Sequence, residues 1–128
     1  MRILSGIQPT GQLHIGNYLG ATQNWKELQG QHDTFFMIAD LHALTVTQDP
    51  KEFSKATLSK FTELLAVGLN PEKCVIFVQS HIKEHTELAW IFNTITPLGE
   101  LERMTQFKDK SAKNIKNIKV LVSPQIVI

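Results

Sequence analysis

Three short apolar runs, separated by longer amphipathic segments, set the pattern of this chain. They cover residues 3–7, 35–39 and 75–78. The last two are rich in aromatic or β-branched residues, which is typical of strands buried on both faces of a parallel sheet. We expect the first run to form a central strand of that sheet.

The segment between the second and third runs carries the signals of a helix at both ends. Asp49 is a good N-cap, Pro50 suits the first helical position, and Glu52 completes a capping box. Gly68 suits the position after the helix, and Pro71 prevents its continuation. The apolar side of this helix repeats at helical spacing through Phe53, Thr57, Phe61, Leu64 and Leu65.

The order of elements predicts an α/β fold. A second helical segment, residues 17–28, lies between the first two runs, so the order is strand, helix, strand, helix, strand. This alternation implies right-handed crossovers and a doubly wound parallel sheet.

The pattern changes after residue 78. Residues 84–95 have helical periodicity, with Leu88, Ile91, Phe92 and Ile95 on one side. The sequence Pro97-Leu98-Gly99 interrupts the pattern, and a more polar helix is expected over residues 100–108.

Length and composition indicate one soluble globular domain. The chain has 128 residues, of which 42% are hydrophobic, which is enough to bury a core. A net charge of +1 does not favour nucleic-acid binding by the chain as a whole. The N-terminus lacks a signal-length apolar core and no run is long enough to span a membrane, so we expect a cytoplasmic location and no membrane partner.

Cysteine and histidine usage supports no disulfide and no zinc site. The one cysteine, Cys74, cannot form an intrachain disulfide, and it lies in an apolar run where a buried, inert thiol is expected. His32, His81 and His85 lack metal-ligand spacing with any cysteine, so no metal is predicted.

The first loop has the features of a phosphate-binding turn. Residues 9–18 follow the first strand and lead into a helix, whose first N–H groups and dipole favour an anion. Gly11 and Gly16 permit tight turns, and His14 and Asn17 can donate hydrogen bonds to phosphate. Spacing alone also allows a simple glycine-rich turn with a solvated His14.

Three ordered blocks resemble the tryptophan-specific branch of the class I aminoacyl-tRNA synthetases. Residues 5–18, including His14-Ile15-Gly16-Asn17, are similar to the family's His-Ile-Gly-His signature, with Asn17 in place of the second histidine. Residues 38–45 and 99–108 match two further family strings. The stretches 6–11 and 104–107 favour tryptophan over the tyrosine-specific relatives, which are the nearest enzyme alternative.

The resemblance implies an ATP-dependent ligase. Tryptophan and ATP with Mg²⁺ give the aminoacyl-adenylate and pyrophosphate, and the aminoacyl group then passes to tRNA. The resemblance also implies a homodimer and no tightly bound cofactor. An alternative of another class is a non-catalytic remnant that binds ATP weakly or serves as a dimerisation module.

The resemblance also implies roles for individual residues. Gln8, Pro9 and Thr10 would form a wall of the ATP pocket, Gly16 and Asn17 would lie under the nucleotide, and His14 would donate to the leaving pyrophosphate. Lys110 would reach the ATP phosphates, whereas the neighbouring lysines suit a solvated face. The residues expected on the tryptophan side are Leu4, Gly6, Asp40 and His42.

Asp40 and His42 also have a structural interpretation. An aspartate after a strand can cap a turn, and a histidine there can be satisfied by backbone groups. Spacing and resemblance together leave both interpretations open for these two residues.

The resemblance divides the chain into three parts. Residues 1–80 correspond to the first half of a Rossmann-type nucleotide-binding fold, and residues 81–120 to the start of a helical insertion that carries the dimer region. Residues 121–128 depart from the family, and no Lys-Met-Ser-Lys-Ser-like string occurs in the chain. We therefore expect a truncated enzyme that is inactive by itself.

Overall fold

The computed structural model describes residues 1–105 and residue 108. The chain forms two compact units, Met1–Ile82 and Lys83–Ile128, and each is considered by itself. Lys110 and the segment 121–128, which carry two of the predictions made above, lie outside the described residues.

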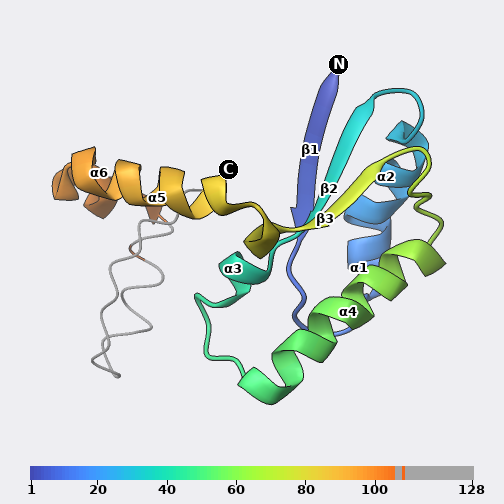
Figure 1. Cartoon of the computed structure of the whole chain (residues 1–128), viewed down its shortest axis with the longest axis horizontal. Helices are drawn as coiled ribbons and strands as arrows, with labels where there is room; N and C mark the ends of the chain where they lie inside the picture. Colours follow the sequence, from blue (N-terminus) through green and yellow to red (C-terminus); the bar gives the residue numbers. More distant parts are fainter. Residues whose placement is uncertain (106–107, 109–128) are drawn as a thin grey trace. The chain divides into compact units, whose positions relative to one another are not determined.

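The first unit contains a three-stranded parallel sheet (Figure 1). Its strands are β1 (Arg2–Ile7), β2 (Asp33–Ile38) and β3 (Val75–Val78), in the spatial order β1-β2-β3. Gly6 pairs with Met37, and Met37 pairs with Phe77, so the three strands are in continuous register. The predicted strands are confirmed, with the second beginning two residues earlier than expected.

The predicted central position of the first strand is wrong for this sheet. β2 is central and β1 lies at an edge, because the strands are laid down in sequence order. Among the described residues, no further strand pairs with the outer side of β1.

A continuous helical segment follows β1. It comprises α1 (Ile15–Asn17), a π-helical turn over Tyr18–Thr22, and α2 (Gln23–Leu28). The Thr22 hydroxyl donates to the Tyr18 carbonyl at 3.4 Å within this wider turn. The predicted helix over residues 17–28 is therefore confirmed, and it begins two residues earlier than predicted.

Helix α4 (Pro50–Ala66) connects β2 to β3 and confirms the helix predicted there. The Asp49 side chain accepts a hydrogen bond from the Lys51 N–H at 2.9 Å, so the predicted N-cap is present. The predicted capping box is wrong, because the Asp49 side chain accepts from the N–H of Lys51 and not of Glu52, and the Glu52 carboxylate pairs with Lys55 at 3.1 Å. Gly68 adopts φ +103° after the helix, a conformation that side chains disfavour.

The core of the first unit lies between the sheet and its two longer helical segments. Trp25 of α2 stacks on Phe36 of β2 with ring centroids 4.8 Å apart and an interplanar angle of 13°. Leu64 of α4 and Ile38 of β2 complete the fully buried centre of this cluster. Burial of this area provides most of the free energy that holds the unit together.

Cys74 joins the edge of the same core. The side chain is buried, as predicted, and burial raises the pKa of its thiol above the ordinary value of 9.0. A thiol in this state is a poor nucleophile at neutral pH.

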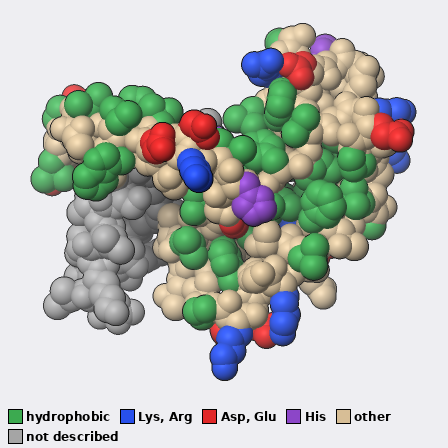
Figure 2. Space-filling model, viewed as in Figure 1, with side chains coloured by type: hydrophobic (Ala, Val, Ile, Leu, Met, Phe, Trp, Pro, Cys, Tyr) green, Lys and Arg blue, Asp and Glu red, His purple; other side chains and the backbone are tan. Residues whose placement is uncertain are grey.

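The second unit contains α5 (Lys83–Ile95) and α6 (Leu98–Arg103). α5 confirms the helix predicted over 84–95. The bounds predicted for the second helix, 100–108, are wrong, because α6 begins at Leu98, directly after Pro97, and ends at Arg103. Many apolar side chains of these helices are exposed, as the green surface along them shows (Figure 2). In the described part of the chain, no helix has both the length and the apolar character needed to cross a membrane.

Candidate nucleotide site

The loop that leaves β1 is built to make a sharp turn. Pro9 is fully buried and packs beneath the loop, whereas Thr10 and Gly11 are exposed. Gly11 adopts φ +66°, which explains the need for glycine at that position. Of the predicted pocket wall, Gln8 and Thr10 therefore have the side-chain surface that a ligand could contact.

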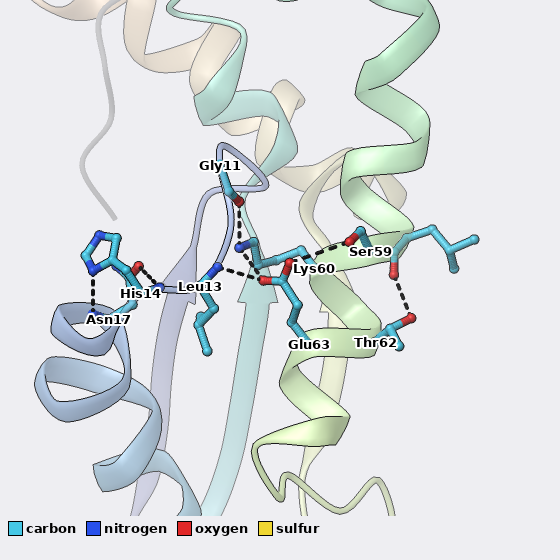
Figure 3. A network of polar contacts seen from close by, with 9 residues as sticks. Gly11, Leu13, His14, Asn17, Ser59, Lys60, Thr62 and Glu63 are labelled. Carbon is cyan, nitrogen blue, oxygen red and sulfur yellow. Dashed lines mark hydrogen bonds and ion pairs between the residues drawn. The ribbon is translucent and has the colours of Figure 1, made fainter.

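His14 and Asn17 form a reciprocal cap at the start of the helix. The His14 N–H donates to Asn17 Oδ1, and the Asn17 N–H donates to His14 Nδ1, both at 3.3 Å (Figure 3). Because Nδ1 is the acceptor, a neutral imidazole in this position carries its proton on Nε2. The exposed His14 ring thus has one N–H donor directed away from its own cap.

Gly16 allows this arrangement by leaving room for the His14 ring. A Cβ at Gly16 would lie 3.1 Å from both Cε1 and Nδ1 of His14. A side chain at residue 16 would push the His14 ring aside by a few tenths of an ångström. The structure brings His14, Gly16 and Asn17 together at an exposed helix N-terminus, as the sequence predicts.

An ion pair on α4, between the buried Lys60 and the half-buried Glu63, reaches the same loop (Figure 3). Lys60 Nζ lies 2.6 Å from Glu63 Oε2 and donates to the Gly11 carbonyl at 3.0 Å. Glu63 Oε2 also accepts from the Leu13 N–H at 3.1 Å. Sequence analysis missed both residues, although a lysine at helical spacing from Phe53 and Leu64 was a signal of a buried charge.

The carboxyl ends of β2 and β3 meet in a second polar cluster. Asp40 begins the short helix α3 (Asp40–Ala43), and the 3₁₀ turn Gln79–His81 follows β3. One Asp40 oxygen, Oδ1, accepts from the N–H groups of Leu41 and Ser80, each at 2.9 Å. The His42 N–H donates to Gln79 Oε1 at 3.2 Å.

This cluster supports the structural interpretation of Asp40. The side chain is 8% exposed, and its Oδ1 joins the loops after two neighbouring strands. The half-buried His42 lies beside it on α3. Contact of either residue with a substrate remains a prediction.

Leu4 and Gly6 lie on one face of β1. Gly6 pairs closely with the central strand, since a Cβ there would come within 3.0 Å of the Met37 carbonyl oxygen. Leu4 is 47% exposed on the same side of the strand. Leu4 is therefore the one of these two residues with side-chain surface available for a ligand.

A pocket lies at the other end of the sheet. It has a volume of about 240 Å³, and residues His32–Thr34 and Pro71–Val75 line it. These residues precede or begin β2 and β3, whereas the polar clusters follow the strands. Ligands of open α/β sheets bind outside the carboxyl ends of the strands, so this pocket is not the nucleotide site.

Comparison with known proteins identifies the family to which the chain belongs. The family model described as "tRNA synthetases class I (W and Y)" matches residues 1–123. The chain is 59% identical over 113 residues to tryptophan–tRNA ligase 2 of Streptomyces avermitilis and 55% identical over 119 residues to tryptophan–tRNA ligase of Prochlorococcus marinus. These alignments cover 88% and 93% of the chain, but only 34% and 35% of the relatives.

Solved structures agree. The tryptophanyl-tRNA synthetase of Campylobacter jejuni complexed with ADP and tryptophan has a TM-score of 0.81 at 43% identity, over 88% of this chain and 35% of that one. The enzyme of Mycoplasma pneumoniae has a TM-score of 0.81 at 46% identity, over 89% and 34% of the two chains. The chain thus spans about a third of the length of these proteins, and its sheet is the Rossmann-like sheet of the class. By sequence and fold, the chain belongs to the class I tRNA synthetases for tryptophan and tyrosine.

Proposed function

We propose that this chain provides the ATP side of a tryptophan–tRNA ligase. The observation that carries the proposal is the His14–Asn17 cap, which presents an imidazole N–H at a helix N-terminus within a segment similar to tryptophan–tRNA ligases along most of its length. The substrates would be ATP, accompanied by Mg²⁺, and tryptophan.

The proposed reaction needs positioning and charge stabilisation. An oxygen of the tryptophan carboxylate attacks the α-phosphorus of ATP in line, and the bond from that phosphorus to the pyrophosphate oxygen breaks. Negative charge then grows on the departing pyrophosphate. The His14 Nε2–H and the amide group of Asn17 are the donors that this chain offers to that charge.

The tryptophan side of the proposal rests on four residues. Leu4 would contact the indole ring, and Gly6 keeps β1 flat against β2. Asp40 and His42 would act at the carboxyl end of β2, with Asp40 fixing the adjacent loops through Oδ1. Lys110, which lies outside the described residues, would also contact the phosphates.

Transfer to tRNA, a homodimer and a cytoplasmic location complete the proposal. The dimer is supported by the exposed apolar side chains of the second unit, among them Trp90 and Ile91 of α5. Exposed apolar surface of this kind is typical of protein–protein contacts.

Titration calorimetry of the purified chain with ATP and Mg²⁺ tests the nucleotide assignment. His14→Ala should weaken ATP binding by roughly ten- to a hundredfold, since a hydrogen bond to a charged group contributes roughly 1.5–3 kcal/mol. His32→Ala is the matched control, because His32 lines the pocket at the opposite end of the sheet, and it should bind ATP as the parent chain does. A parent chain that does not bind ATP would contradict the proposal.

Tryptophan-dependent exchange of pyrophosphate into ATP separates the ligase from its alternative. Exchange that His14→Ala lowers by roughly 10²–10³ would identify a self-sufficient activation site. ATP binding without exchange would favour a nucleotide-binding or dimerisation module, which the exposed apolar side of α5 also suits.

A further inference from the structure

We propose that Lys60 and Glu63 are positioning residues of the nucleotide site, and that this ion pair fixes the backbone of the loop carrying His14. The inference rests on the proposed ATP site for its functional meaning. Neither residue is placed in contact with a substrate.

The geometry joins two backbone groups of the loop to one ion pair. Lys60 donates to the Gly11 carbonyl at 3.0 Å, and Glu63 accepts from the Leu13 N–H at 3.1 Å. The two side chains meet at 2.6 Å. Groups on both sides of Gln12 are therefore held by charges from α4, as Figure 3 shows.

Burial makes this contact selective for one loop conformation. The Lys60 side chain is 2% exposed and that of Glu63 is 24% exposed. A buried ammonium must keep its partners, because an unpaired charge in the interior is strongly unfavourable. Any loop conformation that withdraws the Gly11 carbonyl removes one of the two oxygen atoms, Gly11 O and Glu63 Oε2, that accept hydrogen bonds from Lys60 Nζ.

Stability alone does not account for a charged pair at this position. Well-packed apolar residues often stabilise an interior as well as or better than a buried ion pair does. Residue 60 lies on the apolar face of α4, where a leucine would suit the core. The pair supplies what an apolar side chain cannot, namely directed hydrogen bonds to the loop backbone.

The connection from the pair to the imidazole is short. Glu63 fixes the N–H of Leu13, and the next residue is His14, whose own N–H and Nδ1 are both bonded to Asn17. A displacement of the loop would therefore move the His14 ring, and small displacements of such a donor lower its effect on a reacting phosphate strongly.

The same helix offers a matched control pair. Glu52 and Lys55 have the same types of side chain at the same spacing, 3.1 Å apart, but their side chains are 66% and 74% exposed. Their hydrogen bond, from Lys55 Nζ to Glu52 Oε1, stays within α4. Loss of this exposed pair should have little effect on either the loop or the fold.

The test combines amide hydrogen exchange with ATP titration of the full chain. Lys60→Met and Glu63→Ala should each raise the exchange rate of the Leu13 amide by about tenfold and weaken ATP binding by a similar factor. The amide of Ala39, bonded to the Ile7 carbonyl at 2.8 Å, should keep its protection. Glu63→Gln keeps an oxygen acceptor for Leu13 and should restore most of the protection lost in Glu63→Ala.

Lys55→Met is the control for both measurements. Lys55→Met should match the parent chain in both measurements. Folded Lys60→Met and Glu63→Ala variants with unchanged Leu13 exchange and unchanged ATP affinity would overturn the inference, and so would an equal rise in exchange at Leu13 and Ala39. If Lys60→Met does not fold, the comparison of Glu63→Ala with Glu63→Gln decides. A parent chain that binds no ATP overturns the proposed function, and the exchange measurement still decides whether the pair holds the loop.

Discussion

Helices α4 and α5 are both amphipathic, but they use their apolar sides differently. Leu64 of α4 is 0% exposed and lies in the core of the first unit, whereas Ile91 and Ile95 of α5 are 53% and 67% exposed. The sequence patterns of the two helices are similar, so the pattern alone does not reveal what covers each one. The difference indicates that α4 belongs to a self-contained core and that the apolar side of α5 is available to another surface.

Removal of one side chain from each unit should have the largest and most unequal effects on stability. Phe36→Ala should lower the free energy of unfolding by about 3–5 kcal/mol, because it leaves a cavity against Trp25. Trp90→Ala should change it by less than about 1 kcal/mol, because that side chain is mostly exposed. Denaturant unfolding of the two variants measures both values. Similar losses would show that α5 is part of a buried core.

A second test asks whether the apolar side of the second unit joins two copies of the chain. The insertion over residues 81–120 was predicted to carry the dimer region, and we expect its segment 100–107 to contribute to the contact. Met104 of this segment is half-buried, whereas Phe107 and the side chain of Leu101 lie outside the described residues. Met104→Glu should raise the dissociation constant of a dimer at least tenfold, or by about 1.4 kcal/mol, because it places a charge in an apolar contact.

Light scattering across micromolar concentrations measures this shift. Glu102→Gln, at an exposed neighbouring position, is the control and should leave the association unchanged. A parent chain that stays monomeric well above this range would contradict the proposed dimer contact.

A third test concerns the N-terminus of α4. Asp49→Ala should destabilise the first unit by about 1 kcal/mol, because the Lys51 N–H loses its acceptor. The denaturant midpoint should fall while the slope stays constant. Asp49→Asn keeps a capping oxygen and should recover most of the loss. An unchanged midpoint in Asp49→Ala would mean that the cap adds nothing to the packing of the helix.

The smallest effect is expected at Cys74. Burial raises the pKa of this thiol in the folded chain, so the folded state holds its proton more tightly than the unfolded state does. Its contribution to stability is thus present below the unfolded pKa and is lost as the pH rises through the folded pKa. A thiol reagent should react slowly with the native chain at neutral pH and quickly in denaturant. Equal reaction rates would contradict the buried assignment.

Local signals predicted most of the first unit. The apolar runs predicted all three strands, and Asp49 with Pro50 predicted the start of α4, because capping depends on neighbours in sequence. The edge position of β1 was not predicted, because strand order depends on contacts between distant segments. The short helix α3 was also missed, since four residues carry little periodicity.

The candidate site shows the same division. Gly11, His14, Gly16 and Asn17 could be identified from a continuous stretch, and the structure places Gly11 in the loop after β1 and the other three at the helix start that follows it. Lys60 and Glu63 were missed, because their partners Gly11 and Leu13 are 49 and 50 residues away in sequence. Asp40 Oδ1 accepts a hydrogen bond from the N–H of Ser80, which is 40 residues away in sequence, and no local pattern could indicate that contact.

The edge position of β1 also affects how this chain can be handled. A strand whose outer N–H and C=O groups lack a strand partner among the described residues is a template for any extended segment, including the same strand of another molecule. Such pairing would compete with correct folding as the concentration rises during refolding, and it would produce insoluble material rather than a defined dimer. Slow dilution from denaturant at low concentration therefore gives the chain its best route to the native state.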